Sequence, residues 1–177
     1  MSKKELILGG GCFWCLEAVF ELLEGVEDVV SGYANGEIDN PDYRLVCGGT
    51  TGHAEVVKIT YNEDKIREEE LLDIFFEIHD PTTLNRQGAD RGTQYRSVIL
   101  YENETTKERA MAAKERAQAN HVTPIVTIIE KLNIFYLAEL YHQDYYRQNT
   151  TQGYCMAVIS PKVEKLKNRF AKKIKIS

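Results

Sequence analysis

The sequence has few cysteines, no long apolar run and no internal repeat. Its four cysteines among 177 residues are too few for a disulfide-rich scaffold. Each thiol is therefore a candidate for catalysis, redox chemistry, metal binding or simple burial. No apolar stretch approaches the ~20 residues that span a bilayer, and the apolar run at residues 6–8 is too short for a secretion signal. We therefore expect a cytoplasmic protein with no membrane association.

The chain also lacks an excess of positive charge. It has 22 lysine and arginine residues against 27 aspartate and glutamate residues, which gives a formal net charge of -5. This mild acidity argues against general nucleic-acid binding. The length of 177 residues fits a single domain over residues 1–177, and a chain of this size buries about 70% of its unfolded surface. A monomer is the default expectation.

Apolar periodicity predicts alternating strands and helices along the chain. Strands are predicted at residues 4–8, 26–33, 54–61, 94–101, 125–129 and 157–159, and helices at residues 16–23, 62–78, 105–118, 138–148 and 162–173. Long polar loops at residues 34–52 and 82–93 are candidates for function. This order predicts an α/β protein, an α+β sandwich with a ferredoxin-like β-α-β-β-α-β core, long flanking loops and an extra C-terminal helix.

The run Gly10-Gly11-Cys12-Phe13-Trp14-Cys15 joins the first predicted strand to the first predicted helix. The start of a helix has unpaired N–H groups and a positive dipole end, so we expect the pKa of Cys12 to lie below the free value of about 8.5. The aromatic residues Phe13 and Trp14 can form an apolar wall beside this thiol. The spacing Cys12-x-x-Cys15 also fits a thioredoxin-like redox pair.

Spacing alone leaves the other polar residues open. Glu55 lies where a long loop meets a strand, and an ordinary exposed strand carboxylate is the favoured interpretation. The dense polar block at residues 86–96 indicates a surface loop, in which two glycines and many hydrogen-bonding groups make a site plausible. On the predicted helix at residues 138–148, Tyr145 and Tyr146 are expected to cover the core with their hydroxyls outward.

The two remaining cysteines stand alone in the sequence. Cys155 follows a flexible polar run at residues 149–154, which suits a mobile thiol that reacts with another thiol, and it equally fits a buried cysteine at the start of a strand. Cys47 is expected to be structural. Because neither forms a second C-x-x-C pair, a four-cysteine zinc site is disfavoured.

Five motifs occur in the order of one known family: Gly11-Cys12-Phe13-Trp14, Gly52-His53-Ala54-Glu55, His79-Asp80-Pro81-Thr82, the block at residues 86–96, and Tyr141-His142-Gln143-x-Tyr145. Over roughly residues 6–154 the chain resembles peptide methionine sulfoxide reductases of the A type. The resemblance implies reduction of methionine S-sulfoxide, free or in oxidised proteins, as a protein repair reaction. It implies no metal and no organic cofactor.

The resemblance also assigns roles to individual residues. The nucleophile's place is taken by Cys12, and Phe13 and Trp14 match the aromatic pair that cradles the substrate methyl group. The groups around the sulfoxide oxygen match the acid Glu55, the hydroxyls of Tyr43 and Tyr95, and Asp90, which helps through ordered water. Cys155 resembles the C-terminal recycling cysteine.

This assignment implies a specific reaction. A protonated Glu55, its pKa raised by an apolar pocket, donates to the sulfoxide oxygen while the Cys12 thiolate attacks sulfur. The resulting sulfenic acid condenses with a second thiol, and thioredoxin or a similar dithiol reduces the disulfide. Many family members have glycine at position 15, where this chain has Cys15, so two thiols are candidates to resolve Cys12. We favour Cys155, because a Cys12–Cys15 bridge requires unwinding of the helix start.

Two other classes remain as competing hypotheses. The first is a thioredoxin-like disulfide oxidoreductase that uses Cys12 and Cys15, although no proline of the chain obviously supplies the active-site turn of that fold. The second is a zinc-binding or redox-sensing module without catalytic activity.

Overall fold

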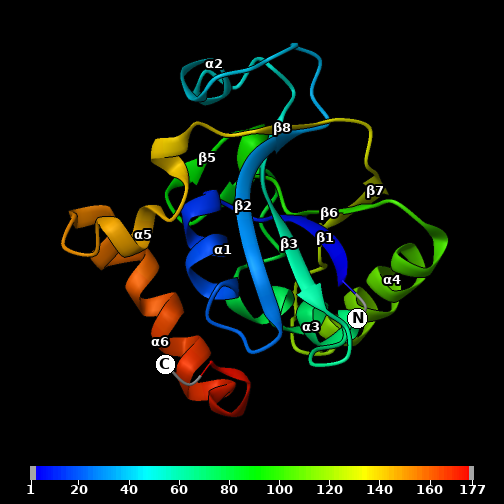
Figure 1. Cartoon of the computed structure of the whole chain (residues 1–177). Helices are drawn as coiled ribbons and strands as arrows, with labels where there is room; N and C mark the ends of the chain where they lie inside the picture. The colour runs from blue at the N-terminus through cyan, green and yellow to red at the C-terminus, as the bar shows by residue number, and fades with distance from the viewer. Residues whose placement is uncertain (1–2, 176–177) are drawn as a thin grey trace.

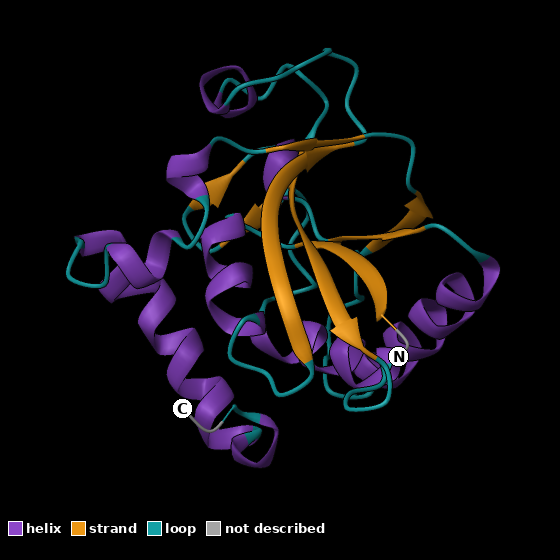
Figure 2. Cartoon of the chain, viewed as in Figure 1, coloured by secondary structure: helices purple, strands orange, loops and turns teal. Residues whose placement is uncertain are grey.

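The computed structural model describes residues 3–175, and within this range one curled sheet forms the centre of the molecule (Figures 1 and 2). Its strand order is β7-β6-β1-β3-β2-β8. The strands are β1 (Lys3–Gly9), β2 (Val26–Ala34), β3 (Ala54–Asn62), β6 (Val98–Tyr101), β7 (Ile128–Lys131) and β8 (Phe135–Leu137). A separate two-residue hairpin is formed by β4 (Arg86–Gln87) and β5 (Asp90–Arg91).

Helices connect and cover these strands. They are α1 (Phe13–Phe20), α2 (Tyr43–Cys47), α3 (Glu68–Ile78), α4 (Glu104–Gln118), α5 (Tyr145–Gln148) and α6 (Ser160–Arg169). Short 3-10 turns occur at Thr93–Tyr95, Leu140–His142 and Ala171–Lys173, and a π-helical turn occupies Cys155–Ile159. None of the helices in the described part of the chain is long and apolar enough to cross a membrane.

The predicted ferredoxin-like core is confirmed. The units β1-α1-β2 and β3-α3-β6 interleave, so that β1 pairs with both β3 and β6, and β3 pairs with β2, all antiparallel. The sheet is extended by β7, parallel to β6, at one edge and by β8, antiparallel to β2, at the other. This arrangement places α1, which begins directly after Cys12, next to the centre of the sheet.

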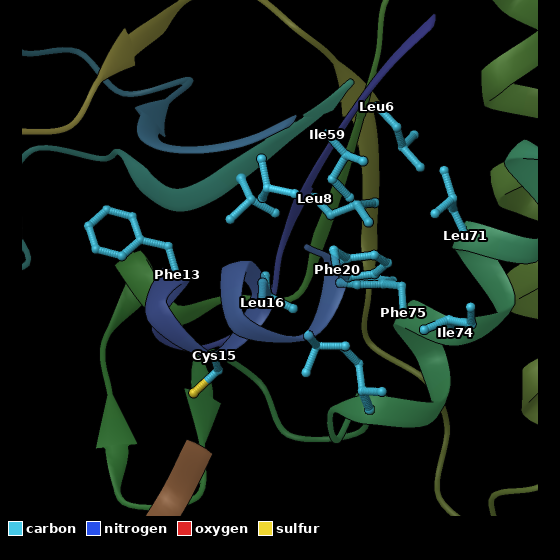
Figure 3. Packing of buried hydrophobic residues seen from close by; sticks show 14 of the residues in the cluster. Leu6, Leu8, Phe13, Cys15, Leu16, Phe20, Ile59, Leu71, Ile74 and Phe75 are labelled. Atoms are coloured by element: carbon cyan, nitrogen blue, oxygen red, sulfur yellow. The ribbon is translucent and has the colours of Figure 1, made fainter. Parts of the chain in front are cut away.

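The main core lies between the sheet and α1 and α3. Because side chains alternate along a strand, Leu6 and Leu8 of β1 join this core whereas Ile7 joins a smaller cluster on the other face. Figure 3 shows Leu8 and Ile59 of the sheet facing the side chains of the two helices. Phe20 of α1 is completely buried there, and burial of such a side chain contributes roughly 1.5–3 kcal/mol.

Most predicted strands and helices are present with shifted ends, but two predictions are wrong. Residues 138–148 do not form one helix, because Asp144 adopts a left-handed conformation (φ 55°) and separates a 3-10 turn from the short α5. Residues 157–159 are not a strand but part of the π-helical turn that leads into α6. The loop predicted at residues 34–52 contains α2, and β8 is an additional strand.

Candidate active site

The glycine turn between β1 and α1 positions Cys12. Gly11 has a φ of 83°, and a Cβ there would lie 2.7 Å from Cγ of Gln87. Any other residue at this position would have a strained backbone and would clash with Gln87, so the turn requires glycine. The Gly11 N–H donates to the carbonyl of Tyr95 at 3.1 Å, which ties the turn to the Thr93–Tyr95 segment. Cys12 follows as the N-cap residue of α1.

The environment of Cys12 differs from the one predicted. Only 6% of the residue is exposed, and burial raises the pKa of its thiol well above the usual value, with the negative charge of Glu55 as the second cause. The backbone N–H of Trp14 acts in the opposite direction but is outweighed. The prediction of a lowered pKa is therefore wrong for this state, because desolvation exceeds the effect of the helix start.

Glu55 is completely buried beside this thiol, so the interpretation as an exposed strand carboxylate is wrong. Its neighbour Val56 faces the smaller core cluster, and alternation turns Glu55 to the opposite face, toward α1. There Oε1 accepts a hydrogen bond from the Phe13 N–H at 3.2 Å, while Oε2 has no partner among residues 3–175. Burial raises the pKa of Glu55 to about 8, although Phe13 N–H and the Cys12 thiol lower it.

Tyr43 and Tyr95 bring two phenol groups to the same place from different loops. Both are partly buried, and burial raises the pKa of each, with Glu55 and Cys12 among the further causes. Tyr43 opens α2, where its backbone N–H donates to Oε2 of Glu139 at 2.9 Å. Tyr95 ends the turn that holds Gly11. The structure therefore brings Cys12, Glu55 and both tyrosines together.

Asp90 joins the site through a residue that sequence reasoning missed. The hydroxyl of Tyr154 donates to Oδ2 of Asp90 at 2.6 Å and lies 4.0 Å from Sγ of Cys15. The position of Tyr154 directly before Cys155 was the one signal in the sequence that pointed to it. The side chain of Cys15 projects from α1 away from the leucines of the sheet (Figure 3), and burial raises the pKa of its thiol.

The two aromatic residues after Cys12 have different exposures. Phe13 is completely buried, and its ring centroid lies 5.6 Å from that of Tyr33 and 5.1 Å from that of His142. Trp14 is partly exposed and stacks on Tyr145 with a centroid distance of 3.7 Å. The Trp14 Nε1–H donates to Nδ1 of His142 at 2.9 Å. Trp14 is therefore the part of the aromatic pair that a ligand meets first.

All four cysteines are free thiols. Cys155 is completely buried in the π-helical turn, which packs against α1, and burial raises its pKa. Cys47 is exposed on α2, beside the Tyr43 side chain, so core packing does not explain it. Within the described residues no group of three or more His, Cys, Asp or Glu side chains has the geometry of a metal site.

A buried thiol, a buried carboxyl group with a raised pKa and two phenols thus form one cluster at the start of α1. The family model described as peptide methionine sulfoxide reductase matches residues 4–174. The chain belongs to the peptide methionine sulfoxide reductase family. Members of this family are oxidoreductases that reduce methionine sulfoxide, and this chain is an enzyme of that class.

Similar proteins agree with this assignment. The chain is 57% identical over 168 residues to peptide methionine sulfoxide reductase MsrA 1 of Rhodopirellula baltica, covering 95% of this chain and 88% of the relative. Reduced Mxr1 of Saccharomyces cerevisiae superposes with a TM-score of 0.82 at 41% identity, covering 86% of this chain and 89% of that chain.

The same yeast protein in complex with Trx2 superposes less closely. Its TM-score is 0.59 at 30% identity, covering 81% of this chain and 84% of that chain. The present structure, with its free thiols, is therefore closer to the reduced yeast form than to the form bound to its partner.

Proposed function

We propose that Cys12 reduces the S epimer of methionine sulfoxide, free or within proteins, with Glu55 as the general acid. The observation that carries this proposal is the unpartnered Oε2 of Glu55, buried beside the thiol. Since the pKa of Glu55 is about 8, this carboxyl group holds a proton at neutral pH. It can donate that proton to an oxygen placed between Cys12, Tyr43 and Tyr95.

The first half of the reaction balances in atoms and electrons. Sγ of Cys12 attacks the substrate sulfur while Glu55 protonates the sulfoxide oxygen, which weakens the S–O bond. The hydroxyl group so formed then moves from the substrate sulfur to Sγ as the S–O and Sγ–S bonds break, and one electron pair remains on the substrate sulfur. That sulfur has gained two electrons and leaves as methionine, while Sγ has lost two electrons and is a sulfenic acid, S–OH. Ionisation of the buried Cys12 thiol is unfavourable by itself. It is coupled to protonation of the oxygen, because the thiol proton replaces the proton that Glu55 donates.

Three different walls explain a preference for one epimer. The oxygen lies at Glu55, Tyr43 and Tyr95, with Asp90 acting through ordered water. The methyl group lies against Trp14 over the buried Phe13. The remaining direction is left for the methionine side chain and the rest of the substrate, so only one arrangement of the three substituents on sulfur fits.

Cys155 resolves the sulfenic acid. Its thiol attacks Sγ of Cys12, a water molecule leaves, and a Cys12–Cys155 disulfide forms. A dithiol protein of the thioredoxin type then reduces this disulfide by thiol exchange, as the complex of yeast Mxr1 with Trx2 suggests by analogy. Cys15 is the alternative, but it shares the first turn of α1 with Cys12, so a Cys12–Cys15 bridge requires that turn to unwind. The cycle needs no metal or organic cofactor, and we place it in a cytoplasmic monomer that binds neither nucleic acid nor membrane.

Turnover of the separated sulfoxide epimers with a dithiol reductant tests the proposal. We expect the S epimer to be reduced and the R epimer to remain, with no reaction in the Cys12→Ser variant. Equal reduction of both epimers, or activity without Cys12, would overturn it.

A further inference from the structure

The outer edge of β8 carries unpaired backbone groups beside the active site. β8 is the terminal strand of the sheet and pairs with β2 on one side. The Ala138 N–H donates to Ser31 at 2.9 Å, and the Ile134 carbonyl accepts from Asn35 at 3.0 Å. Because such bonds alternate along an antiparallel strand, the backbone groups of Phe135 and Leu137 point away from β2. No segment within the described range pairs with them.

This open edge is bordered by exposed apolar side chains. The edge lies at the surface, since Leu137 is exposed and Phe135 is only partly buried. The exposed fractions are 58% for Leu137, 84% for Leu140 and 60% for Tyr141. We call these three residues the apolar rim. An unpaired edge with an apolar border is a template for an additional strand.

The edge is continuous with the site. Glu55 of β3, Tyr33 of β2 and Tyr136 of β8 lie opposite one another in one row across the sheet. Two residues beyond β8, Glu139 accepts hydrogen bonds from the Tyr33 hydroxyl at 2.8 Å and the Tyr43 N–H at 2.9 Å. Glu139 thereby connects the end of β8 to the start of α2. A polypeptide on this edge therefore runs alongside the segment that positions Tyr43.

We propose that β8 is the docking strand for the polypeptide substrate: an extended apolar segment of an oxidised protein pairs with Phe135 and Leu137 as one more strand. This inference rests on the proposed function and names the form in which protein substrates are recognised. Main-chain hydrogen bonds supply affinity that does not depend on sequence, and the apolar rim favours hydrophobic neighbours of the oxidised methionine.

The spacing of the sheet sets where the sulfoxide lies relative to the paired residues. Neighbouring strands are about 4.8 Å apart, so a strand added to β8 lies three spacings, or about 14 Å, from β3 and Glu55. An extended chain covers about 3.3 Å per residue. The methionine sulfoxide therefore lies about four residues along the chain from the residues that pair with β8. Because the segment must be extended to pair with β8 and reach the site, folded segments that cannot extend are expected to be poor substrates.

Peptides with a single methionine S-sulfoxide in an extended apolar sequence test this inference. One series carries an N-methyl group on one backbone nitrogen at a time, from two to six residues on either side of the sulfoxide. Free methionine sulfoxide is measured in parallel, because it has no flanking backbone to pair and so reports on the proposed function separately. The quantity compared is the ratio of kcat/KM for the peptide to kcat/KM for free methionine sulfoxide.

Leu137→Pro removes one outward N–H from β8 and leaves the bonds to β2 in place, and proline is tolerated on edge strands. We expect Leu137→Pro to lower this kcat/KM ratio about tenfold by raising KM for the peptide. N-methylation about four residues from the sulfoxide should lower the ratio to a similar extent in the unaltered protein, but should have no further effect in the variant. Should Leu137→Pro fail to fold, Leu137→Glu keeps the backbone and removes part of the apolar rim. Met111→Glu, at a side chain 55% exposed on α4, is the matched control. A ratio that neither variant nor N-methylation changes would overturn the inference.

Discussion

The hydroxyl of Tyr154 donates a hydrogen bond to Oδ2 of Asp90 at 2.6 Å. Because Tyr154 directly precedes Cys155, this bond anchors the segment that must move if Cys155 is to reach Cys12. The bond thus joins the segment of Cys155 to Asp90, an acid of the proposed oxygen-binding group. In the proposed cycle, resolution of the sulfenic acid by Cys155 begins with breaking this contact.

Tyr154→Phe should loosen the C-terminal segment. A hydrogen bond to a charged group contributes about 1.5 kcal/mol, so amide hydrogen exchange at residues 152–159 should become roughly tenfold faster. Tyr146→Phe is the control, because its hydroxyl contacts Oγ of Ser160 at 2.7 Å in the same region without touching Asp90. Exchange at residues 152–159 of Tyr154→Phe that is no faster than in the unaltered protein would show that the bond to Asp90 does not hold the segment.

The rate of the first half-reaction should fall as the pH rises through about 8. The protonated form of Glu55 is the donor, and its pKa of about 8 sets where that form is lost. Glu55→Gln should fold, since its amide oxygen can still accept from the Phe13 N–H, but should lose about 10²–10⁴-fold in methionine formation. Rapid-quench measurement of a single turnover without reductant checks both points. A near-normal rate in Glu55→Gln would remove the acid from the mechanism.

Stability should decrease with pH because of a second buried carboxyl group. Burial raises the pKa of Glu17 to about 7, opposed by the backbone N–H groups of Asp144 and Tyr145. The folded state therefore keeps a proton that the unfolded state releases near its ordinary pKa. The stabilisation is complete below about pH 4.5 and is lost as the pH rises through about 7.

Glu17→Gln should reduce this pH dependence by up to about 3 kcal/mol, as measured by urea unfolding at pH 5 and pH 7.5. Some dependence will remain, because Glu55 acts in the same direction. The exposed Glu24→Gln is the control. An unchanged pH dependence in Glu17→Gln would mean that Glu17 is charged in the folded state.

Cysteine variants should separate the first half-reaction from recycling. Cys155→Ser should release one methionine per enzyme and then stop with a thioredoxin-type reductant, whereas Cys15→Ser and Cys47→Ser should continue to turn over. Mass mapping after one turnover should find a Cys12–Cys155 bridge. A dominant Cys12–Cys15 bridge would assign resolution to Cys15 instead.

Gly11→Ala should be more damaging than Gly88→Ala, although both glycines have positive φ. A Cβ at Gly88 meets nothing within 4 Å, so the cost there is backbone strain of about 1–2 kcal/mol. At Gly11 the added Cβ would also lie 2.7 Å from Cγ of Gln87. Relief of this clash must displace the start of α1. We expect single-turnover rates to fall in Gly11→Ala and to be unaffected in Gly88→Ala. Similar rates would show that Gln87 yields without moving Cys12.

The sequence pattern predicted the core because each strand and helix there has a local signal. Alternation in β3 and the apolar face of α3 are visible in any window of ten residues. The fate of Glu55 was not visible in this way, since an acidic residue on a strand is usually exposed. Its burial follows from where α1 packs, and the proposed role of Glu55 came from the family resemblance of the motif around it.

The region after β7 was predicted less well because its conformation depends on contacts distant in sequence. The left-handed Asp144 interrupts an otherwise helical pattern next to Glu17 of α1. Cys155 and its neighbours have strand-like composition but pack against α1 as a π-helical turn. The contact of Tyr154 could not be predicted from local pattern, because its partner Asp90 lies 64 positions away in the sequence.

The single tryptophan of the chain sits where the moving segment meets the nucleophile helix. The indole of Trp14 is stacked on Tyr145, bonded to His142 and met edge-on by Tyr154 with a centroid distance of 5.9 Å. Release of Tyr154 in the proposed resolution step removes this edge contact and exposes more of the indole to water, which shifts its emission to longer wavelength. Tryptophan emission therefore reports on the proposed opening during turnover.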